Sequence, residues 1–335
     1  MQWQRRHGRK DLPWQASTDP YRVWLSEVML QQTQVSAVIP YFERFLQKFP
    51  TVAALAAASE DEVLQVWSGL GYYARGRNLH AAANIIAEKG FPKTAGQIAE
   101  LPGVGRSTAA AIAAFAFGER AAILDGNVKR VLARHAGIAG FPGDKAVEAK
   151  LWGCAEKLLP KKDIAVYTQA LMDLGATVCT KSKPRCDACP VHHTCVALKK
   201  GLTAKLPAPR PKKAVPSKST TWLVLRHAGQ VLLERRPSPG IWGGLWSFPE
   251  VAGSNVAKSC RDLGYDVGSM RDLNVIEHGF THYRLTIQPV LCDLRRLPSR
   301  AESPGRLWID IEEAGASATP APVKKLLQTF TRGIS

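Results

Sequence analysis

Four cysteines and two histidines gather in the segment CTKSKPRCDACPVHHTC, which spans residues 179–195. The thiols are Cys179, Cys186, Cys189 and Cys195, spaced C-x6-C-x2-C-x5-C. Four thiolates suit either a tetrahedral zinc ion or a [4Fe–4S] cluster. His192 and His193 offer an alternative zinc set together with Cys186, Cys189 and one other thiol. The segment therefore predicts a metal site and leaves the choice of metal open.

Two carboxylates stand beside apolar residues. Glu27, in WLSEVMLQQTQV, has Val23 and Leu25 as neighbours on a predicted helix. A carboxyl group in such surroundings is expected to have a raised pKa and can act as a general acid. The alternative is a surface glutamate at a helix edge. Asp125 ends the apolar run in AILDGNVKRVLAR, where it can cap the following helix or face a cleft.

A glycine-rich turn precedes a predicted helix in LPGVGRSTAAAIAAFAFG. Gly103 and Gly105 allow a tight turn with uncovered backbone N–H groups, and Ser107 or Thr108 can open the helix. Such amides and a helix N-terminus bind phosphate well, and they hold a nucleic-acid backbone without reading its sequence. The alternative is an ordinary packing corner between two helices.

The elements that must position these residues follow two different patterns. Residues 1–200 are predicted to be mostly helical, with Ser59 and Glu62 as a helix-capping pair and with helices stopping at Pro40 and Pro50. A proline-rich basic stretch at 204–218 is typical of a linker. From residue 219 onward, runs such as TTWLVLRHAGQVLLERRP and HYRLTIQPVLCDL predict strands of an α+β domain.

The charge of the chain favours a polyanionic partner. The formal net charge is +17. Residues 1–218 carry 31 Lys and Arg against 17 Asp and Glu, whereas residues from 219 onward carry 14 against 11. This excess predicts nucleic-acid binding, and the alternative is a generally basic surface. No segment has the composition of a secretory signal or a membrane span, so we expect a cytoplasmic protein with reduced thiols.

Several motifs together resemble the MutY family of adenine DNA glycosylases. They are LPWQ, WLSEVMLQQTQV, GLGYYARGRNLH, LPGVGRSTA, ILDGNVKRVLAR, MDLGATVCTKSKPRCDACP, GIWGGLWSFPE and HGFTHYRLTI, which cover nearly the whole chain. The resemblance implies a mainly α region at 1–203, made of a helix-hairpin-helix six-helix domain and a [4Fe–4S] helical domain with its cluster loop at 179–195. An interdomain linker at 204–218 and a Nudix-like α+β domain at 219–335, which reads 8-oxoguanine, follow.

The resemblance also implies a reaction. Adenine mispaired with 8-oxoguanine or guanine leaves the stack of double-stranded DNA, and its N-glycosidic bond is hydrolysed, which initiates base excision repair. Glu27 protonates N7 of the adenine, ionised Asp125 stabilises the cationic sugar, and Asn127 and Ser107 assist nearby. Endonuclease III, a sister group, has a nucleophilic lysine where this chain has Ser107. A serine cannot form a Schiff base, so we expect a monofunctional glycosylase.

Further residues take their expected roles from the same resemblance. The four cysteines hold a [4Fe–4S] cluster rather than zinc. The DNA contacts are expected from Gln31, Gln32, Tyr72, Gly103, Gly105, Arg106, Lys181, Lys183 and Arg185. Among them, Gln32 and Tyr72 match family positions that wedge into the duplex around the 8-oxoguanine. Phe280, Thr281 and His282 match the loop that reads 8-oxoguanine, with threonine in place of the usual serine. The second domain lacks an R-E-x-x-E-E acidic box, so pyrophosphatase activity is not expected.

Two other functions compete with this interpretation. One is an endonuclease III-like lyase, for which a lysine at position 107 and the lack of a second domain would be typical. The other is a non-catalytic DNA-binding protein built on a zinc module, for which loss of Glu27 or Asp125 would be typical. We expect a bacterial, nucleoid-associated monomer in the cytoplasm that does not bind membranes.

Overall fold

The computed structural model describes residues 1–211, 215–237, 240–251, 255–280, 283–297 and 304–332. Two residues of the predicted 8-oxoguanine loop, Thr281 and His282, lie outside these ranges. The chain divides into two compact units. The first comprises Met1–Ala57 and Asn78–Lys212, and the second comprises Ala58–Arg77 and Lys213–Ser335. The sequence pattern had not separated residues 58–77 from the helical region around them.

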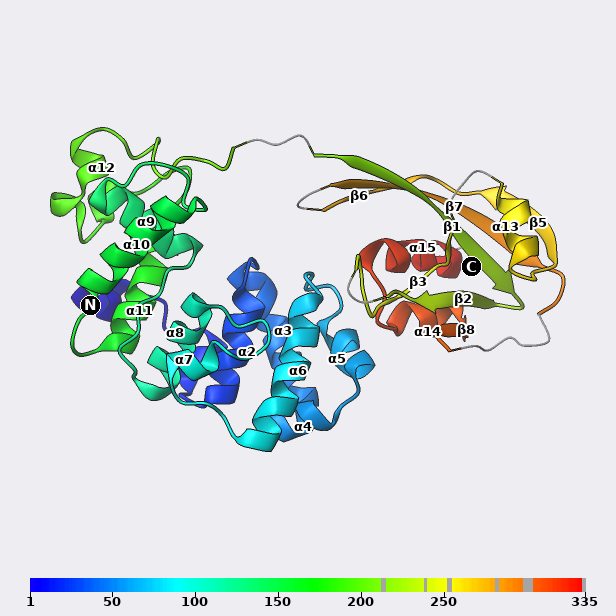
Figure 1. The fold of residues 1–335 in the computed structure, drawn as a ribbon, viewed down its shortest axis with the longest axis horizontal. Coiled ribbons are helices and arrows are strands. Elements are labelled where there is room, and N and C mark those ends of the chain that lie inside the picture. The colour runs from blue at the N-terminus through cyan, green and yellow to red at the C-terminus, as the bar shows by residue number, and fades with distance from the viewer. Residues whose placement is uncertain (212–214, 238–239, 252–254, 281–282, 298–303, 333–335) are drawn as a thin grey trace. The chain divides into compact units, whose positions relative to one another are not determined.

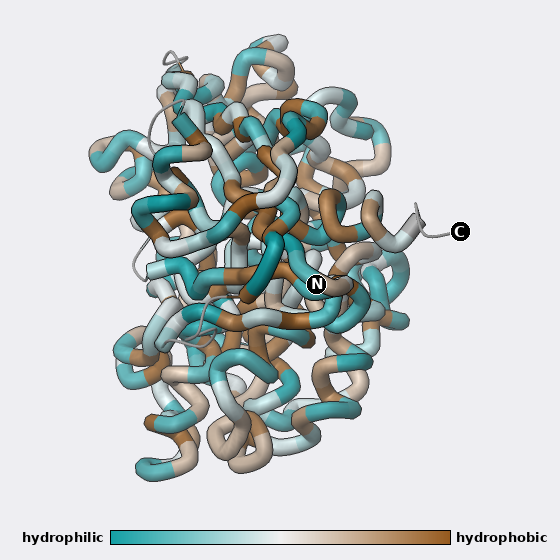
Figure 2. Tube along the Cα trace, turned by 90° about the vertical axis from the view of Figure 1, so that its right-hand side faces the viewer, coloured by the Kyte–Doolittle hydropathy of each residue, from teal (hydrophilic) through white to brown (hydrophobic). Residues whose placement is uncertain are grey.

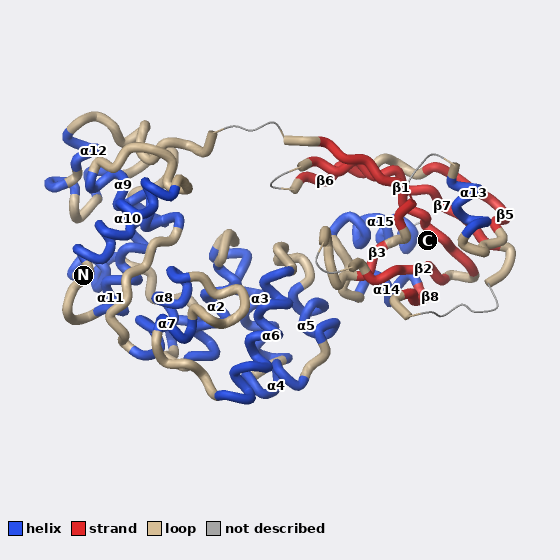
Figure 3. The backbone as a smooth tube through the Cα atoms, viewed as in Figure 1, coloured by secondary structure: helices blue, strands red, loops and turns tan. Residues whose placement is uncertain are grey.

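The first unit is helical, as predicted (Figures 1 and 3). Its helices are α1 (Gln2–His7), α2 (Pro20–Leu30), α3 (Val35–Lys48), α4 (Val52–Ala57), most of α6 (Ala74–Lys89), α7 (Ala95–Ile98), α8 (Arg106–Phe117), α9 (Gly126–Ala136), α10 (Lys145–Leu158), α11 (Ile164–Asp173) and α12 (Val196–Lys199). Short helical turns span Pro13–Ala16, Leu174–Val178, Cys186–Ala188 and His192–Thr194. Figure 2 shows hydrophilic and hydrophobic stretches interspersed along the chain.

Local chemistry explains where the helices around the candidate site begin and end. Pro20 opens α2, and the side chain of Asp19 accepts a hydrogen bond from the Tyr21 backbone N–H at 3.1 Å. Helix α8 ends at Gly118 and α9 ends at Gly137, with φ of 68° and 69°. Glycine adopts this left-handed conformation without steric strain, so both helices stop cleanly.

The predicted helix end at Pro40 is wrong. Pro40 lies inside α3, as its sixth residue. A proline here lacks the N–H that would bond the carbonyl four residues earlier, yet α3 continues through it to Lys48. The chain instead breaks between α2 and α3, where Gln32 has a φ of 58°. This break separates Glu27 on α2 from the following helix and leaves Gln32 exposed.

The second unit contains a mixed β-sheet with flanking helices. Its strands are β1 (Ser217–His227), β2 (Gln230–Arg235), β3 (Trp246–Ser247), β4 (Glu250–Val251), β5 (Val267–Asp272), β6 (Ile276–Gly279), β7 (Arg284–Leu294) and β8 (Arg306–Asp310). Its helices are α5 (Glu60–Trp67), α13 (Val256–Asp262), α14 (Ile311–Ala316) and α15 (Ala321–Arg332). The capping pair predicted at Ser59 and Glu62 is confirmed at the start of α5.

The sheet has the order β3-β2-β1-β7-β5, with β4, β6 and β8 pairing to β1, β7 and β2. Strands β1 and β7 run parallel, in the register Leu223 to Val290, and the other pairs are antiparallel. Alternate residues of β1 enter two cores. Trp222 and Val224 pack with α14 and α15, and Leu223 and Leu225 pack with α13. Helices therefore cover both faces of the sheet, which confirms the α+β prediction.

Candidate active site and cysteine loop

The two predicted carboxylates lie close together in the first unit. Glu27 comes from α2 and Asp125 directly precedes α9, and the charge of Asp125 acts on Glu27. Burial first, and then the charge of Asp125, raises the pKa of Glu27 to about 8. The expectation of a raised pKa is therefore confirmed. At neutral pH the Glu27 carboxyl group carries a proton that it can donate.

Glu27 faces a cavity of about 380 Å³, here called the Glu27 cavity. Its further walls include Trp14, Gln15, Phe115 and Gln169. No role for these four residues had been predicted, although LPWQ contributed to the family resemblance. They come from elements far apart in the chain, and nothing in their local spacing links them. Only the packing of the N-terminal segment against α8 and α11 brings them to one cavity.

The buried Asp173 carboxylate binds the N-terminal segment near this cavity through hydrogen bonds from Gln4 and Arg9. Asp173, at the end of α11, has no exposed surface. Its Oδ1 accepts hydrogen bonds from Arg9 Nε at 2.8 Å and Gln169 Nε2 at 2.9 Å. Its Oδ2 accepts from Gln4 Nε2 at 2.8 Å and the Arg9 backbone N–H at 2.9 Å. This set of donors stabilises the buried charge and orients Gln169 at the cavity wall.

Asp125 is both a helix cap and a half-buried carboxylate. Its Oδ1 accepts a hydrogen bond from the Val128 backbone N–H at 2.7 Å, which confirms the cap interpretation. Burial raises the pKa of Asp125, whereas hydrogen bonds from Val128 and Asn127 and the charge of Arg130 favour its ionised form. Burial therefore opposes ionisation of Asp125, and these donors and the Arg130 charge support it.

Ser107 makes a hydrogen bond with the backbone next to Asp125. Its Oγ accepts a hydrogen bond from the Leu124 backbone N–H at 2.9 Å. The hydroxyl thus joins the start of α8 to the residue that precedes the carboxylate. This contact had not been predicted, and it defines a structural task for the serine at this position.

Asn127 and Arg130 extend the site toward the cysteine loop. Arg130 Nη2 donates to Asn127 Oδ1 at 2.9 Å and to the Gly175 carbonyl at 2.6 Å, and its Nε donates to the Cys179 carbonyl at 2.7 Å. A Cβ at Gly175 would lie 2.6 Å from Asn127 Cβ. The two backbones therefore approach so closely that only glycine fits at position 175.

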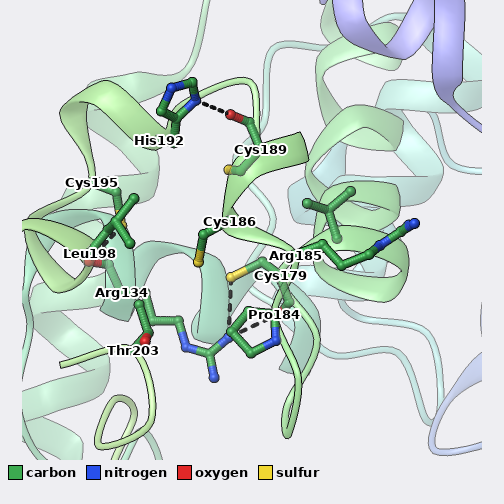
Figure 4. Close-up of a pocket in the computed structure, with 11 residues that line it drawn as sticks. Arg134, Cys179, Pro184, Arg185, Cys186, Cys189, His192, Cys195, Leu198 and Thr203 are labelled. Carbon is green, nitrogen blue, oxygen red and sulfur yellow. Dashed lines mark hydrogen bonds between the residues drawn. The ribbon is translucent and has the colours of Figure 1, made fainter. Parts of the chain in front are cut away.

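The four predicted cysteine ligands line one pocket with Arg134 and His192 (Figure 4). Arg134 Nη1 lies 3.3 Å from Cys179 Sγ and also donates to the Thr180 carbonyl at 2.7 Å. The seven cysteines, all within the described ranges, form no disulfide. In the part of the chain that the structure describes, no three Cys, His, Asp or Glu side chains are arranged to hold one metal ion.

The histidines of this loop have other contacts. His192 Nδ1 lies 2.7 Å from the Cys189 carbonyl oxygen, and the rings of His192 and His193 lie 3.7 Å apart. Lys181, Lys183 and Arg185 on the same loop are exposed, so they are accessible to a polyanion.

The glycine turn before α8 has the predicted open backbone. Gly103 has a φ of 75°, and a Cβ there would lie 2.7 Å from Asn78 Cβ. Gly105 precedes α8 with no side chain capping the helix, so the first backbone amides of α8 are uncovered by a cap. Arg106 extends over the Trp152 ring, with its guanidinium carbon 3.8 Å from the ring centroid, and forms an ion pair with Glu156. Its guanidinium therefore already has partners on α10.

The candidate wedge residues have unusual backbones. Gln32, in the first unit, and Tyr72, in the second, have φ of 58° and 49°. Non-glycine residues adopt this conformation at a cost that is often retained at functional sites. Tyr72 is 49% exposed, which is high for such an aromatic residue. Gln31, next to the first wedge position, donates from Nε2 to Thr108 Oγ1 at 3.3 Å.

Phe280 lies at the end of β6 in the second unit, against other aromatic rings. It stacks on Tyr283 at a centroid distance of 4.5 Å and meets His278 edge to face at 4.7 Å. The neighbouring Thr281 and His282 fall outside the described residues, so their predicted contacts are not tested.

Comparisons with known proteins support the predicted family. A family model described as "HhH-GPD superfamily base excision DNA repair protein" matches residues 25–157, and one described as "NUDIX domain" matches residues 220–329. An adenine DNA glycosylase of Buchnera aphidicola is 36% identical over 342 residues, which cover 100% of this chain and 97% of that protein. The human adenine DNA glycosylase is 34% identical, over 96% of this chain and 71% of that protein.

The chain belongs to the adenine DNA glycosylase family. This membership confirms the predicted family, the fold class and the class of DNA-repair enzyme. Solved structures agree for the helical region. A thermostable thymine-DNA glycosylase superposes with a TM-score of 0.51 at 28% identity, over 57% of this chain and 90% of that chain. An endonuclease III bound to DNA shares the fold, with a TM-score of 0.50 at 24% identity, over 58% of this chain and 90% of that chain.

The comparisons support neither of the two competing functions. The family of enzymes that matches nearly the whole chain leaves no support for a non-catalytic zinc protein. The likeness to endonuclease III is one of fold, and position 107 holds serine.

Among the described residues, no helix is both long and apolar enough to cross a membrane.

Proposed function

We propose that this adenine DNA glycosylase family member hydrolyses the N-glycosidic bond of adenine mispaired with 8-oxoguanine or guanine in double-stranded DNA. The observation that carries the proposal is the half-buried Glu27–Asp125 pair, in which Glu27 faces a cavity and has a pKa near 8. One protonated and one ionised carboxyl group is the arrangement that glycosidic chemistry requires.

Glu27 supplies the proton. The flipped adenine enters the Glu27 cavity, and the carboxyl group donates its proton to N7 of the base. The bond between C1′ and N9 then breaks, and its electrons remain on the leaving adenine. The sugar becomes cation-like, and a water molecule adds to C1′ and releases its proton. Trp14 and Phe115 supply the apolar walls of the cavity, and Gln15 and Gln169 supply hydrogen-bonding groups.

Asp125 carries the negative charge of the pair. Both carboxyl groups are largely removed from water, and two neighbouring carboxylates cannot both ionise readily. Asp125 receives hydrogen bonds from Val128 and Asn127 and feels the charge of Arg130, whereas only burial and repulsion act on Glu27. The shared proton therefore resides on Glu27, and Asp125 faces the developing sugar cation as an anion.

The enzyme is monofunctional. Ser107 has no amine with which to form a Schiff base, so the chain itself provides no lyase nucleophile at this position. Its hydroxyl instead accepts the Leu124 N–H and holds the backbone beside Asp125. Asn127 supports Asp125 in turn, through its side chain and backbone.

DNA is held by a basic loop and a phosphate-binding turn, and distorted by two wedge residues. Lys181, Lys183 and Arg185 are exposed on the cysteine loop and neutralise phosphates. Gly103, Gly105 and the α8 amides bind one strand, with Arg106 and Gln31 beside them. Gln32 and Tyr72 enter the duplex around the 8-oxoguanine. Phe280, Thr281 and His282 read that base.

Cys179, Cys186, Cys189 and Cys195 hold a [4Fe–4S] cluster. Their common pocket and the guanidinium of Arg134 near Cys179 Sγ suit an anionic cluster with four thiolate ligands. The cluster, when bound, supplies structural support for the basic loop and takes no part in the glycosidic chemistry. A band near 410 nm in the absorption spectrum of purified protein would identify it; a colourless protein containing zinc would contradict it.

The remaining proposals concern organisation. Residues 1–203 form the glycosylase region, 204–218 the linker and 219–335 the 8-oxoguanine recognition domain. The protein acts as a monomer on DNA in the bacterial cytoplasm.

The test is single-turnover adenine release from a duplex with adenine opposite 8-oxoguanine, with and without alkali. Free adenine with strand breaks only after alkali supports a monofunctional glycosylase. Breaks without alkali would contradict the proposed role of Ser107. A duplex with adenine opposite thymine serves as the control, and equal release from both would contradict mispair recognition.

A further inference from the structure

The loop that presents Tyr72 belongs to the second compact unit. Residues Ala58–Arg77 form one unit with Lys213–Ser335, although they interrupt the helical region in sequence. The Tyr72 loop, defined here as residues 68–73, follows α5 within this segment. The candidate wedge and the aromatic residues around Phe280 therefore lie in the same unit.

Helix α5 is built into the core of this unit. Leu64, with no exposed surface, belongs to the hydrophobic cluster that contains Trp222 of β1 and Leu327 of α15. Gln65 Nε2 donates to the Ala316 carbonyl at 3.0 Å. Arg235, the last residue of β2, lies 2.8 Å from Asp61 Oδ1 through its Nη2 atom. A buried apolar contact, a hydrogen bond to a backbone carbonyl and an ion pair together hold α5 to the strands and helices of residues 217–332, here called the sheet domain.

A tight turn links this docked segment to the region of Phe280. In the docking turn, defined here as residues 242–244, the Gly243 carbonyl accepts a hydrogen bond from Arg77 Nη1. Gly244 has a φ of 78°, and a Cβ there would meet Glu60 Oε1 at 3.1 Å and Leu64 Cδ1 at 3.5 Å. Position 244 is therefore in close contact with α5.

Trp242, at the other end of the docking turn, packs against His278 and Phe280. The ring of Trp242 lies 5.4 Å from the Phe280 ring and 5.5 Å from the His278 ring. Trp242 is 9% exposed and has a φ of 54°, so its backbone is held in a strained conformation by its surroundings. The same three residues thus contact α5 on one side and the aromatic neighbours of the reading loop on the other.

Arg75 and Trp67 hold the Tyr72 loop to the end of α5. Arg75, 8% exposed, lies with its guanidinium carbon 5.5 Å from the Trp67 ring centroid and 5.4 Å from the Tyr72 ring centroid. It donates to the Gly71 carbonyl at 3.1 Å, and Trp67 Nε1 donates to the same oxygen at 3.2 Å. Because Trp67 ends α5, a displacement of α5 displaces Tyr72 with it.

We propose that the docking turn and Arg235 are positioning residues for the Tyr72 wedge, and that they couple its insertion to the reading of 8-oxoguanine by the Phe280 loop. This inference rests on the proposed function, because it takes Tyr72 as the wedge and Phe280 as part of the reader. It assigns to the sheet domain a mechanical task in addition to base recognition. Tyr72 and Phe280 move together, so that 8-oxoguanine bound at Phe280 places Tyr72 at the adjoining base step.

The first arm of the test measures insertion directly. The probe is a duplex with a non-cleavable 2′-fluoro-adenosine opposite 8-oxoguanine and with 2-aminopurine next to the 8-oxoguanine. Insertion of Tyr72 unstacks the 2-aminopurine and raises its fluorescence. Tyr72→Ala should abolish this rise. A full rise with Tyr72→Ala would overturn the inference, because Tyr72 would then not be the wedge.

The decisive pair of variants is Gly244→Asn and Gly229→Asn. Both glycines have a positive φ, 78° and 83°, which asparagine tolerates best among residues with a Cβ. Gly229 has nothing within 4 Å of a Cβ, whereas Gly244 faces α5. Gly244→Asn should reduce the fluorescence rise to the level of Tyr72→Ala, and Gly229→Asn should keep it. Equal behaviour of the two variants would overturn the inference.

A charge exchange tests the same docking from a distant point. Arg235→Glu places a carboxylate against Glu60 and Asp61 and should lower the rise, and the second change Asp61→Arg should restore it. Failure of the double variant to recover would refute the role of Arg235. If Gly244→Asn fails to fold, this arm still tests the docking, because a rescued double variant must itself be folded.

Adenine release supplies the second readout. Gly244→Asn should slow single-turnover release opposite 8-oxoguanine by about ten- to a hundredfold and should have no further effect in a Tyr72→Ala background. Multiplying losses in the double variant would overturn the inference. If the unaltered protein released no adenine, the proposed function would fail, and the fluorescence arms would still decide the docking, since they need binding alone.

Discussion

At the scale of residues, the candidate site depends on the different surroundings of two carboxyl groups. Glu27 is buried beside a negative charge and has a pKa near 8, whereas donors from the start of α9 surround Asp125. The nearest backbone amides belong to the helix that Asp125 caps, so one local feature both starts α9 and supports the anion. A neutral acid and an anion can therefore coexist in one buried site.

Glu27→Gln should reduce single-turnover adenine release by at least about a hundredfold while leaving DNA affinity nearly unchanged, because the amide cannot donate an acidic proton. A quenched-flow assay and a binding titration check both parts. Turnover at the unaltered rate would refute the acid role. The exposed Glu313→Gln on α14 is the control and should change neither quantity.

The same substitution should raise thermal stability at alkaline pH. A folded-state pKa near 8, above the ordinary value of 4.5, favours folding below pH 4.5, and this contribution is lost as pH rises through 8. Glutamine avoids the buried charge. Melting curves should show Glu27→Gln more stable than the unaltered protein at pH 9, by roughly 1–3 kcal/mol, and similar near pH 5. Lower stability at pH 9 would contradict the burial argument.

The rate of adenine release should depend on pH with a falling limb near pH 8. Deprotonation of Glu27 removes the acid, so the rate should fall about tenfold per pH unit above that value. On the acidic side, the rate should rise as Asp125 ionises, at a pH above the ordinary aspartate range because burial raises its pKa. A single-turnover profile with no falling limb below pH 10 would contradict the assignment of Glu27.

At the scale of elements, the site depends on close approaches between segments that are distant in sequence. Helix α2 supplies Glu27, α8 supplies Ser107, and α9 begins at Asp125. The turn at Leu174–Val178 touches the start of α9 so closely that Gly175 has no room for a side chain. Asn127 and Arg130 thus receive their positions from the segment that leads into the cysteine loop.

Gly175→Ala should destabilise the fold by about 1–3 kcal/mol and slow adenine release, because the added methyl group must displace the Asn127 backbone. Gly153→Ala is a matched control. Gly153 lies inside α10 with nothing within 4 Å of a Cβ, so alanine there should stabilise the protein by roughly 0.5–1 kcal/mol. Chemical denaturation measures both. Equal shifts in the two variants would show that the contact at Gly175 is unimportant.

At the scale of the whole molecule, the positive charge is concentrated in residues 1–218. The exposed basic residues of the cysteine loop lie in that region, and the sheet domain is closer to neutral. We therefore expect the first 218 residues to supply most of the affinity for the DNA backbone and the sheet domain to supply recognition of the base opposite adenine.

Replacing Lys181, Lys183 and Arg185 with alanine should weaken DNA binding and flatten its salt dependence. Each lost phosphate contact lowers the slope of log affinity against log salt by about 0.9. Lys258, Lys324 and Lys325 are exposed lysines of the sheet domain, and their replacement serves as the control with an unchanged slope. Binding titrations at several salt concentrations give the slopes. An unchanged slope in the loop variant would place the phosphate contacts elsewhere.

The sequence by itself determined the residues whose spacing is local. The four cysteines, the Ser59–Glu62 cap, the glycine turn before α8 and the carboxylates within their segments were all recognisable, because chain neighbours or one helical turn define them. The change from helical to strand patterns was equally visible, since each pattern repeats within a few residues. Family resemblance then attached proposed roles to these positions.

Tertiary structure decided what depends on packing between distant segments. The break lies at Gln32, which has a positive φ, and not at Pro40, where α3 continues in spite of the missing N–H. The walls of the Glu27 cavity, the anchoring by Asp173 and the inclusion of α5 in the sheet domain had no local signal. Burial and partner choice are set by all the segments that meet at a place, so the pKa of Glu27 and the support of Tyr72 appear only in the folded chain.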